Sequence, residues 1–129
     1  MKVILFRSAV ALFVLFLVLF VSWREMVNPV FSGIAACFSV HNQKMNEVYA
    51  QAISAQDMSA RRGLICQADV ESTNSLRGCL RKVKSEYLLG EVLINDIPNL
   101  GLNTKKRVNF GVREHNRMCP DVPIAEERL

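Results

Sequence analysis

The sequence predicts an α+β domain that an N-terminal helix holds to a membrane, and three features of its 129 residues predict this. Residues 8–23 form a run of sixteen without a charge or a proline, which is too apolar for one face of a small core. Residues 43–61 contain neither glycine nor proline and place apolar side chains at helical spacing. Residues 87–95 have a strand-like composition, and residues 108–112 alternate apolar and polar side chains. We therefore predict a main helix packed on an antiparallel β-hairpin or small sheet.

The N-terminal segment, residues 1–23, is predicted to be an uncleaved signal anchor. A cleaved signal peptide has an apolar run of about 7 to 15 residues and then a small-residue cleavage site. This run is longer, and Trp23 and charged residues follow it. Lys2 and Arg7 precede the run while only Arg24 follows it closely, which favours a cytoplasmic N terminus and a domain outside the cytoplasm.

A lipoprotein is the alternative for this end of the chain. Ile34-Ala35-Ala36-Cys37 resembles a lipobox, in which Cys37 would be lipidated after cleavage. A lipobox sits directly at the end of the apolar run, whereas here two charged residues and Pro29 intervene. Residues 24–36 are instead predicted to be a linker, since Pro29 disfavours helix at the residue before it and Gly33 permits a bend.

The four cysteines, Cys37, Cys66, Cys79 and Cys119, lie in the part of the chain predicted to be outside the cytoplasm. An even number of cysteines in a small extracytoplasmic domain is typical of a disulfide framework. Three pairings are possible, and the sequence does not choose among them. The nested pairing, Cys37 with Cys119 and Cys66 with Cys79, would tie the start of the domain to its end and add about 4 kcal/mol through the outer loop.

A zinc site is the alternative for two of these cysteines, because Cys37, His41, His115 and Cys119 form two mirror-image pairs at one-turn spacing. Zinc thiolates suit reducing compartments, and Pro120 ends any helix that carries His115, so we predict no metal site. Cys37 and His41 also have the chemistry of a nucleophile and its base, but an oxidising compartment favours disulfides. No HExxH, GxSxG or glycine-rich phosphate loop occurs. We expect no catalytic residue, no cofactor and no enzyme activity.

The predicted elements follow one another as helix, shorter helix and hairpin. Asn42 is placed to cap the main helix, and cations followed by Gly63 are placed to end it. A shorter helix is predicted around residues 76–83, with an apolar face and a basic face. An all-helical domain is the alternative, because residues 76–94 could form one long helix. The chain then divides into a membrane anchor, a linker, one small extracytoplasmic α+β domain and an irregular tail: residues 1–23, 24–36, 37–119 and 120–129.

Residues 33–40, which lead into the predicted main helix, and residues 106–112, which lead to Cys119, resemble the immunity proteins against the bacteriocin colicin M. That family has an N-terminal anchor and a periplasmic α+β domain, and one disulfide joins a cysteine just after the anchor to one near the C terminus. Cys66 and Cys79 depart from this pattern. The resemblance implies an inner-membrane protein that protects its producer by binding a bacteriocin that attacks peptidoglycan precursor lipid.

A non-enzymatic accessory subunit of an envelope machine, for secretion, conjugation, division or phage lysis control, is the alternative function. Both functions need a protein partner and a membrane, and neither needs nucleic acid. From Arg24 onward 14 basic residues face 12 acidic ones, and the basic clusters lack interleaved aromatic residues. A nearly neutral domain of this composition is a poor nucleic-acid binder.

Overall fold

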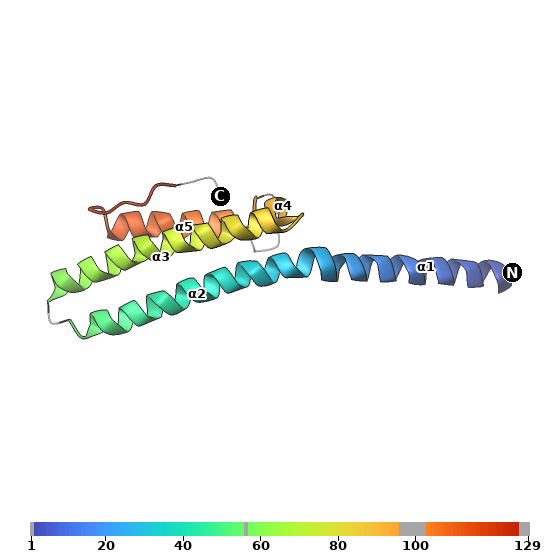
Figure 1. The fold of residues 1–129 in the computed structure, drawn as a ribbon, viewed down its shortest axis with the longest axis horizontal. Helices are drawn as coiled ribbons and strands as arrows, with labels where there is room; N and C mark the ends of the chain where they lie inside the picture. Colours follow the sequence, from blue (N-terminus) through green and yellow to red (C-terminus); the bar gives the residue numbers. More distant parts are fainter. Residues whose placement is uncertain (1, 56, 96–102, 127–129) are drawn as a thin grey trace.

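The computed structural model describes residues 2–55, 57–95 and 103–126, and of residues 2–7 the backbone only. Its elements are α1 (Lys2–Ser22), the π-helical turn η1 (Trp23–Val27), α2 (Asn28–Ile53), α3 (Met58–Glu86), α4 (Gly90–Asn95) and α5 (Thr104–Met118) (Figure 1). These residues contain no strand. The predicted α+β class with a β-hairpin is therefore wrong, and the described part of the chain is all-helical.

The predicted anchor forms a helix that continues without a break through η1 into α2 (Figure 1). α1 has 21 residues, which at 1.5 Å per residue gives about 31 Å, the thickness of a hydrocarbon core. Its side chains from Ser8 to Ser22 are exposed. Within the described residues, α1 belongs to the one helix that is long and apolar enough to cross a membrane.

The segment predicted as a linker, residues 24–36, is helical. In η1 the backbone N–H of Asn28 donates to the carbonyl of Trp23, the i→i+5 bond of a π-turn. Pro29 directly follows this π-turn, and the helix continues past the N–H that the proline lacks. The proline therefore does not separate the anchor from the domain.

α2 and α3 form an antiparallel hairpin and bury an apolar seam between them (Figure 1). Leu80, which is 0% exposed, is part of the core that this seam builds. Buried side chains recur mostly every three or four residues, the spacing of neighbours on one helix face. They include Val30, Ile34, Cys37, Met45 and Ala52 of α2, and Cys66, Thr73, Leu76, Leu80 and Val83 of α3.

The main helix predicted at residues 43–61 contains the turn of this hairpin. α2 ends at Ile53, and Asp57 starts α3 as its N-cap. The Asp57 carboxylate accepts hydrogen bonds from the backbone N–H groups of Ser59 at 3.3 Å and Ala60 at 3.2 Å. These bonds satisfy two N–H groups that a helix start leaves free, so a capping aspartate starts α3 here.

The Asp57→Ala variant is expected to melt a few degrees below the wild type, because α3 loses its cap. Hydrogen bonds from the N–H groups of Ala60 and then Ser59 lower the pKa of Asp57 from its ordinary value of 3.8. A lowered carboxyl pKa stabilises the fold above the ordinary value, and this contribution is lost as the pH falls through the folded-state pKa. Circular-dichroism melts of both proteins should therefore differ at neutral pH and converge once the carboxylate is protonated. A difference that stays constant down to acidic pH would contradict the capping role.

The two segments predicted as strands are also helical. α4 occupies most of residues 87–95, and a Cβ on its Gly90 would lie 2.7 Å from the carbonyl oxygen of Lys84, so only glycine allows this close contact with α3. α5 contains all of residues 108–112. Phe110 is 65% exposed, whereas Val108 and Val112, with which it would share a face in a strand, are buried. The buried face of α5 has helical spacing instead: Thr104, Val108, Val112 and His115.

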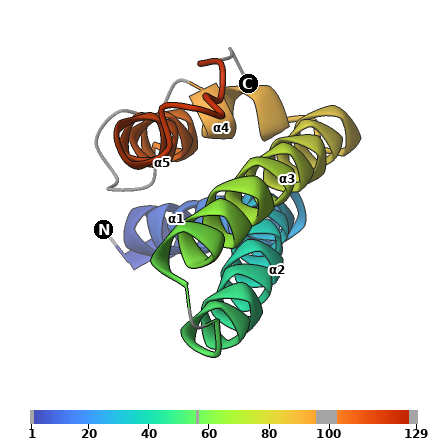
Figure 2. The ribbon, with the colours of Figure 1, turned by 90° about the vertical axis from the view of Figure 1, so that its left-hand side faces the viewer.

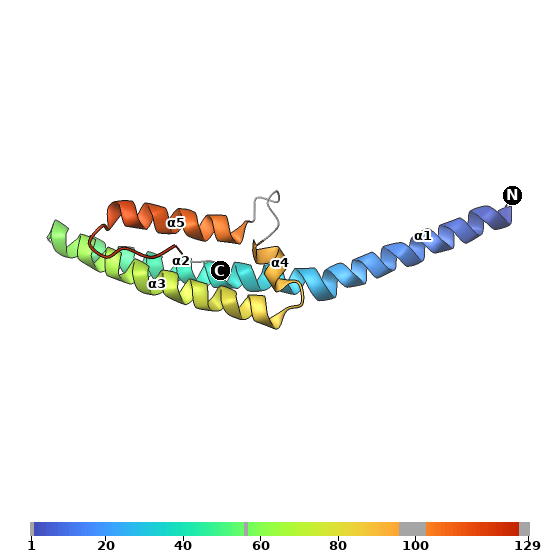
Figure 3. The ribbon, with the colours of Figure 1, turned by 90° about the horizontal axis from the view of Figure 1, so that it is seen from above.

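α3 lies between α2 and α5 when the domain is viewed from its far end (Figure 2). α4 lies near the junction of α1 and α2, and the turn between α2 and α3 lies at the opposite end (Figures 1 and 3). The core cluster contains residues of α2, α3, α4 and α5, among them Val30, Leu80, Ile94 and Val108. The best-packed part of the domain is therefore the part nearest the anchor.

A candidate binding groove between α2 and α5

All four cysteines are in disulfides, but the pairing is interleaved. Cys37 of α2 bonds Cys79 of α3, with 5.7 Å between their Cα atoms. Cys66 of α3 bonds Cys119 just after α5, with 5.8 Å between their Cα atoms. The nested pairing considered above, and with it the Cys37–Cys119 bond that the family resemblance implies, is not formed. Each disulfide joins two neighbouring elements: Cys37–Cys79 joins α2 to α3, and Cys66–Cys119 joins α3 to the end of α5.

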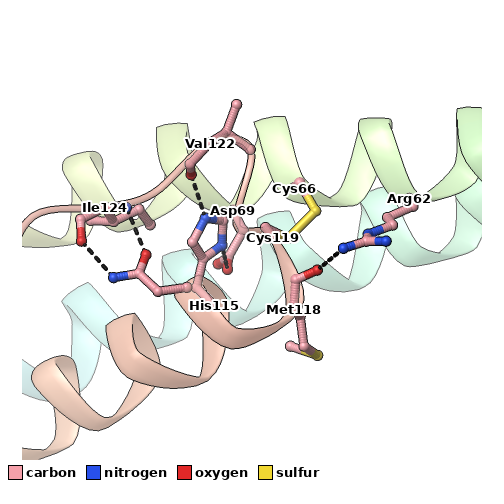
Figure 4. Close-up of a disulfide and its surroundings, with 9 residues drawn as sticks. Arg62, Cys66, Asp69, His115, Met118, Cys119, Val122 and Ile124 are labelled. Atoms are coloured by element: carbon pink, nitrogen blue, oxygen red, sulfur yellow. Dashed lines mark hydrogen bonds and ion pairs between the residues drawn. A yellow bond between two sulfur atoms is a disulfide. The ribbon is translucent and has the colours of Figure 1, made fainter.

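His115 lies 1% exposed at the end of α5, beside the second disulfide (Figure 4). Its Nδ1 is 2.6 Å from the Asp69 carboxylate, and its Nε2 is 2.9 Å from the Val122 carbonyl. Both partners are acceptors, so a ring with a proton on each nitrogen satisfies both. The ring joins three segments: α3, α5 and the C-terminal strap, by which we mean residues 119–126.

The C-terminal strap has no regular secondary structure, but it is fixed to the domain. The Asn116 side chain donates to the Ile124 carbonyl at 2.9 Å and accepts from the Ile124 N–H at 2.7 Å. The buried Arg77 donates to the Ala125 carbonyl at 2.5 Å. Arg62 donates to the carbonyl of Met118, just before the strap (Figure 4). These bonds hold α5 and the strap on α3.

The two disulfides exclude the zinc site and the Cys37–His41 nucleophile and base that the sequence offered as alternatives. Cys37 and Cys119 are in different disulfides, so neither supplies a thiolate. The described residues contain no group of three or more potential metal ligands. Ser72 Oγ lies 2.7 Å from Nδ1 of His41, the spacing of a nucleophile and base, but Ser72 is 1% exposed and therefore closed to a substrate.

A groove of about 970 Å³ runs along α2 and is closed on one side by the start of α5. The Arg107 guanidinium carbon lies 4.3 Å from the centre of the Phe38 ring and forms this wall. The side of α2 that lines the groove carries apolar residues near the anchor and mostly polar residues farther away, including the carboxylate of Glu47. Its positions again have helical spacing: Phe31, Ala35, Phe38, Asn42, Asn46 and Ala50.

The prediction of a linker at residues 24–36 left this groove unpredicted. Phe31, Ala35 and Phe38 are three or four residues apart, and this spacing continues through Gly33 into the predicted main helix. That continuity was the signal for a long helix with two faces. One face packs on α3, while the other remains open.

The fold departs from what the resemblance to colicin M immunity proteins implies. The described residues contain neither an antiparallel sheet nor a Cys37–Cys119 disulfide. Comparisons with protein-family models, with curated proteins and with solved structures found no match to this chain.

Proposed function

We propose that this chain is a single-pass inner-membrane protein whose extracytoplasmic helical domain holds an amphipathic helix of a partner protein in the α2–α5 groove. It acts by binding, without catalysis, as an accessory subunit of an envelope machine. The observation that carries this proposal is the groove itself, which begins beside the anchor. Two disulfides accord with the oxidising compartment in which we place the domain.

The dimensions of the groove favour a helix as the occupant. Its α2 wall extends from Phe31 to Ala50, which is about 28 Å of helix or five turns. Apolar residues line its anchor-near half and mostly polar residues, including the carboxylate of Glu47, line its far half. A bound helix therefore needs an apolar stripe that becomes more polar away from the membrane. A disulfide behind the groove wall, Cys37–Cys79, keeps α2 in place before the partner arrives.

Charge favours a different protein over a second copy of this chain. Two copies anchored in one membrane would pair in parallel, so their α5 starts would meet at the same height. Each start carries Lys105, Lys106 and Arg107, and like charges at that position repel. A partner helix with carboxylates at its membrane-near end would instead pair with these cations.

The accessory-subunit role is favoured over the bacteriocin-immunity role. The immunity role depended on a resemblance that implies a helix on a sheet, and the described residues form helices and no strand. A groove that starts next to the anchor suits a partner in the same membrane. A toxin that arrives from outside needs no such placement.

A photocrosslinking amino acid at Ala35 should join the chain to a partner in intact cells, because Ala35 lines the groove. Val40, which is 66% exposed on α2 and does not line the groove, is the matched control position. Adding Ala35→Arg to a chain with the crosslinker at Ala50 should abolish the product by filling the groove with a charge, while leaving the melting temperature within a few degrees of wild type.

Two results would contradict this function. Equal crosslinking from Ala35 and Val40 would show that the groove is not the contact surface. A product of twice the mass of the chain would show that a second copy occupies the groove.

A further inference from the structure

The turn between α3 and α4 exposes an apolar side chain at the end of the domain nearest the anchor. Leu88 is 84% exposed, more than any other large apolar side chain among the described residues, and Val92 of α4 is 47% exposed. Tyr87 and Leu89 on either side of Leu88 pack against the core, so the turn is held firmly with Leu88 pointing outward. We call residues 86–92 the α3–α4 corner.

The α3–α4 corner lies at the end of the domain nearest the anchor. A Cβ on Gly33 would lie 3.8 Å from the Tyr87 ring, which places the end of α3 beside the first turns of α2. Val27, the last residue of η1, packs against the same core cluster as Leu89. Figures 1 and 3 show the corner beside the junction of α1 and α2.

Basic side chains from three separate segments lie in the anchor-near half of the domain, with Arg107 beside Phe38 of α2. The domain is nearly neutral in total, but folding collects its cations at one end. Within the described residues this end holds seven basic side chains besides the buried Arg77, and three acidic ones, Glu25, Glu86 and Glu91. The seven are Arg24 of η1, Arg81, Lys82 and Lys84 of α3, and Lys105, Lys106 and Arg107 of α5.

Three of these cations have carboxylate partners, of which Arg24 pairs with Glu25 at 3.9 Å, and basic side chains still outnumber acidic ones at this end. Lys82 pairs with Glu86 at 3.6 Å, and Lys84 pairs with Glu91 at 3.2 Å. Both carboxylates are at least half exposed, so water screens the pairs. The opposite half of the domain has the reverse balance, with five basic and seven acidic described residues.

We infer that the α3–α4 corner is a second membrane contact, in which Leu88 enters the interface and the surrounding cations bind anionic phospholipid headgroups. An apolar tip flanked by Lys and Arg is the chemistry that recognises an anionic lipid surface. The anchor supplies continuity, because α1 ends where a hydrocarbon core would end and the corner lies beside the first turns of α2. This inference rests on α1 crossing the membrane, and it is independent of what occupies the groove.

The test places a tryptophan at the α3–α4 corner of the full chain. In a Trp23→Phe background, Leu88→Trp is compared with Met58→Trp, because Met58 is 76% exposed at the far end of the domain. Both proteins are reconstituted into phosphatidylcholine vesicles with about 30 mole per cent phosphatidylglycerol, in which the phosphatidylcholine carries bromine at shallow acyl positions. We expect Leu88→Trp to be quenched several-fold more than Met58→Trp and to emit at shorter wavelength.

The charge contribution is tested in the same vesicles. Lys82→Gln with Lys106→Gln should reduce quenching of Leu88→Trp, as should about 0.5 M salt. The control pair, Arg113→Gln with Arg117→Gln in the far half, should leave quenching unchanged. Equal quenching in pure phosphatidylcholine vesicles would overturn the headgroup assignment.

Equal quenching of the two tryptophans in vesicle-bound protein would overturn the membrane contact and leave the α3–α4 corner to a protein partner. Failure of the chain to float with the vesicles would overturn it as well, because α1 would then not span. These vesicles contain no other protein, so none of these results depends on groove binding. Loss of the Ala35 crosslink, conversely, would leave the lipid contact intact.

Discussion

Replacing Cys37 and Cys79 together by alanine is expected to lower the free energy of unfolding by about 4 kcal/mol on the chain-entropy model. The disulfide joins residues that are 42 apart in the sequence, so it lowers the conformational entropy of the unfolded chain. For a domain of this size the melting temperature should fall by roughly 15–30 °C. Circular-dichroism melts of the full chain in detergent would measure it.

The control is the exposed position Ser75 of α3, where Ser75→Ala should leave the melting temperature within a few degrees. Replacing Cys66 and Cys119 should have an effect of similar size, because those residues are 53 apart. A fall of less than about 5 °C for either pair would show that the packed helices, and not the crosslinks, hold the domain.

The His115→Ala variant is expected to lose about 3 kcal/mol, because it leaves the Asp69 carboxylate and the Val122 carbonyl without their shared donor and opens a cavity. The strap should loosen with it. The Ile124 N–H donates to the side chain of Asn116, the residue that follows His115, and it should exchange its hydrogen faster. Denaturant unfolding and hydrogen-exchange mass spectrometry would measure the two effects.

His41→Ala is the matched control, since His41 is half-buried and its one described hydrogen bond is to Ser72. It should cost about 1 kcal/mol and leave the exchange of Ile124 unchanged. Equal losses in both variants would contradict the bridging role of His115.

The anchor and the capacity for disulfides were predictable, because they depend on composition alone. The pairing of Cys37 with Cys79 could be predicted only if the turn near Asp57 was identified. Cys37 lies 20 residues before Asp57 and Cys79 lies 22 after it. In an antiparallel hairpin that turns near Asp57 these two cysteines face each other. Without the turn, this pairing had no support.

The helical state of α5 and the basic end of the domain were not predicted, for two different reasons. Val108, Phe110 and Val112 alternate like a strand, but only packing on α3 reveals that Phe110 faces outward. The basic end of the domain could not be predicted, because its cations are up to 83 residues apart in sequence. Folding alone collects them beside the anchor.

The π-turn between the anchor and α2 fixes a rotation as well as a height. Each residue of an α-helix advances the face by about 100°, so the extra residue accommodated by a π-turn changes the azimuth of everything beyond it. With no flexible joint between α1 and α2, any rotation of α1 within the bilayer rotates the groove by the same angle. The lipid-facing surface of the anchor therefore sets the direction in which the groove faces. Transmembrane helices that pack against α1 would fix the orientation of the domain as well.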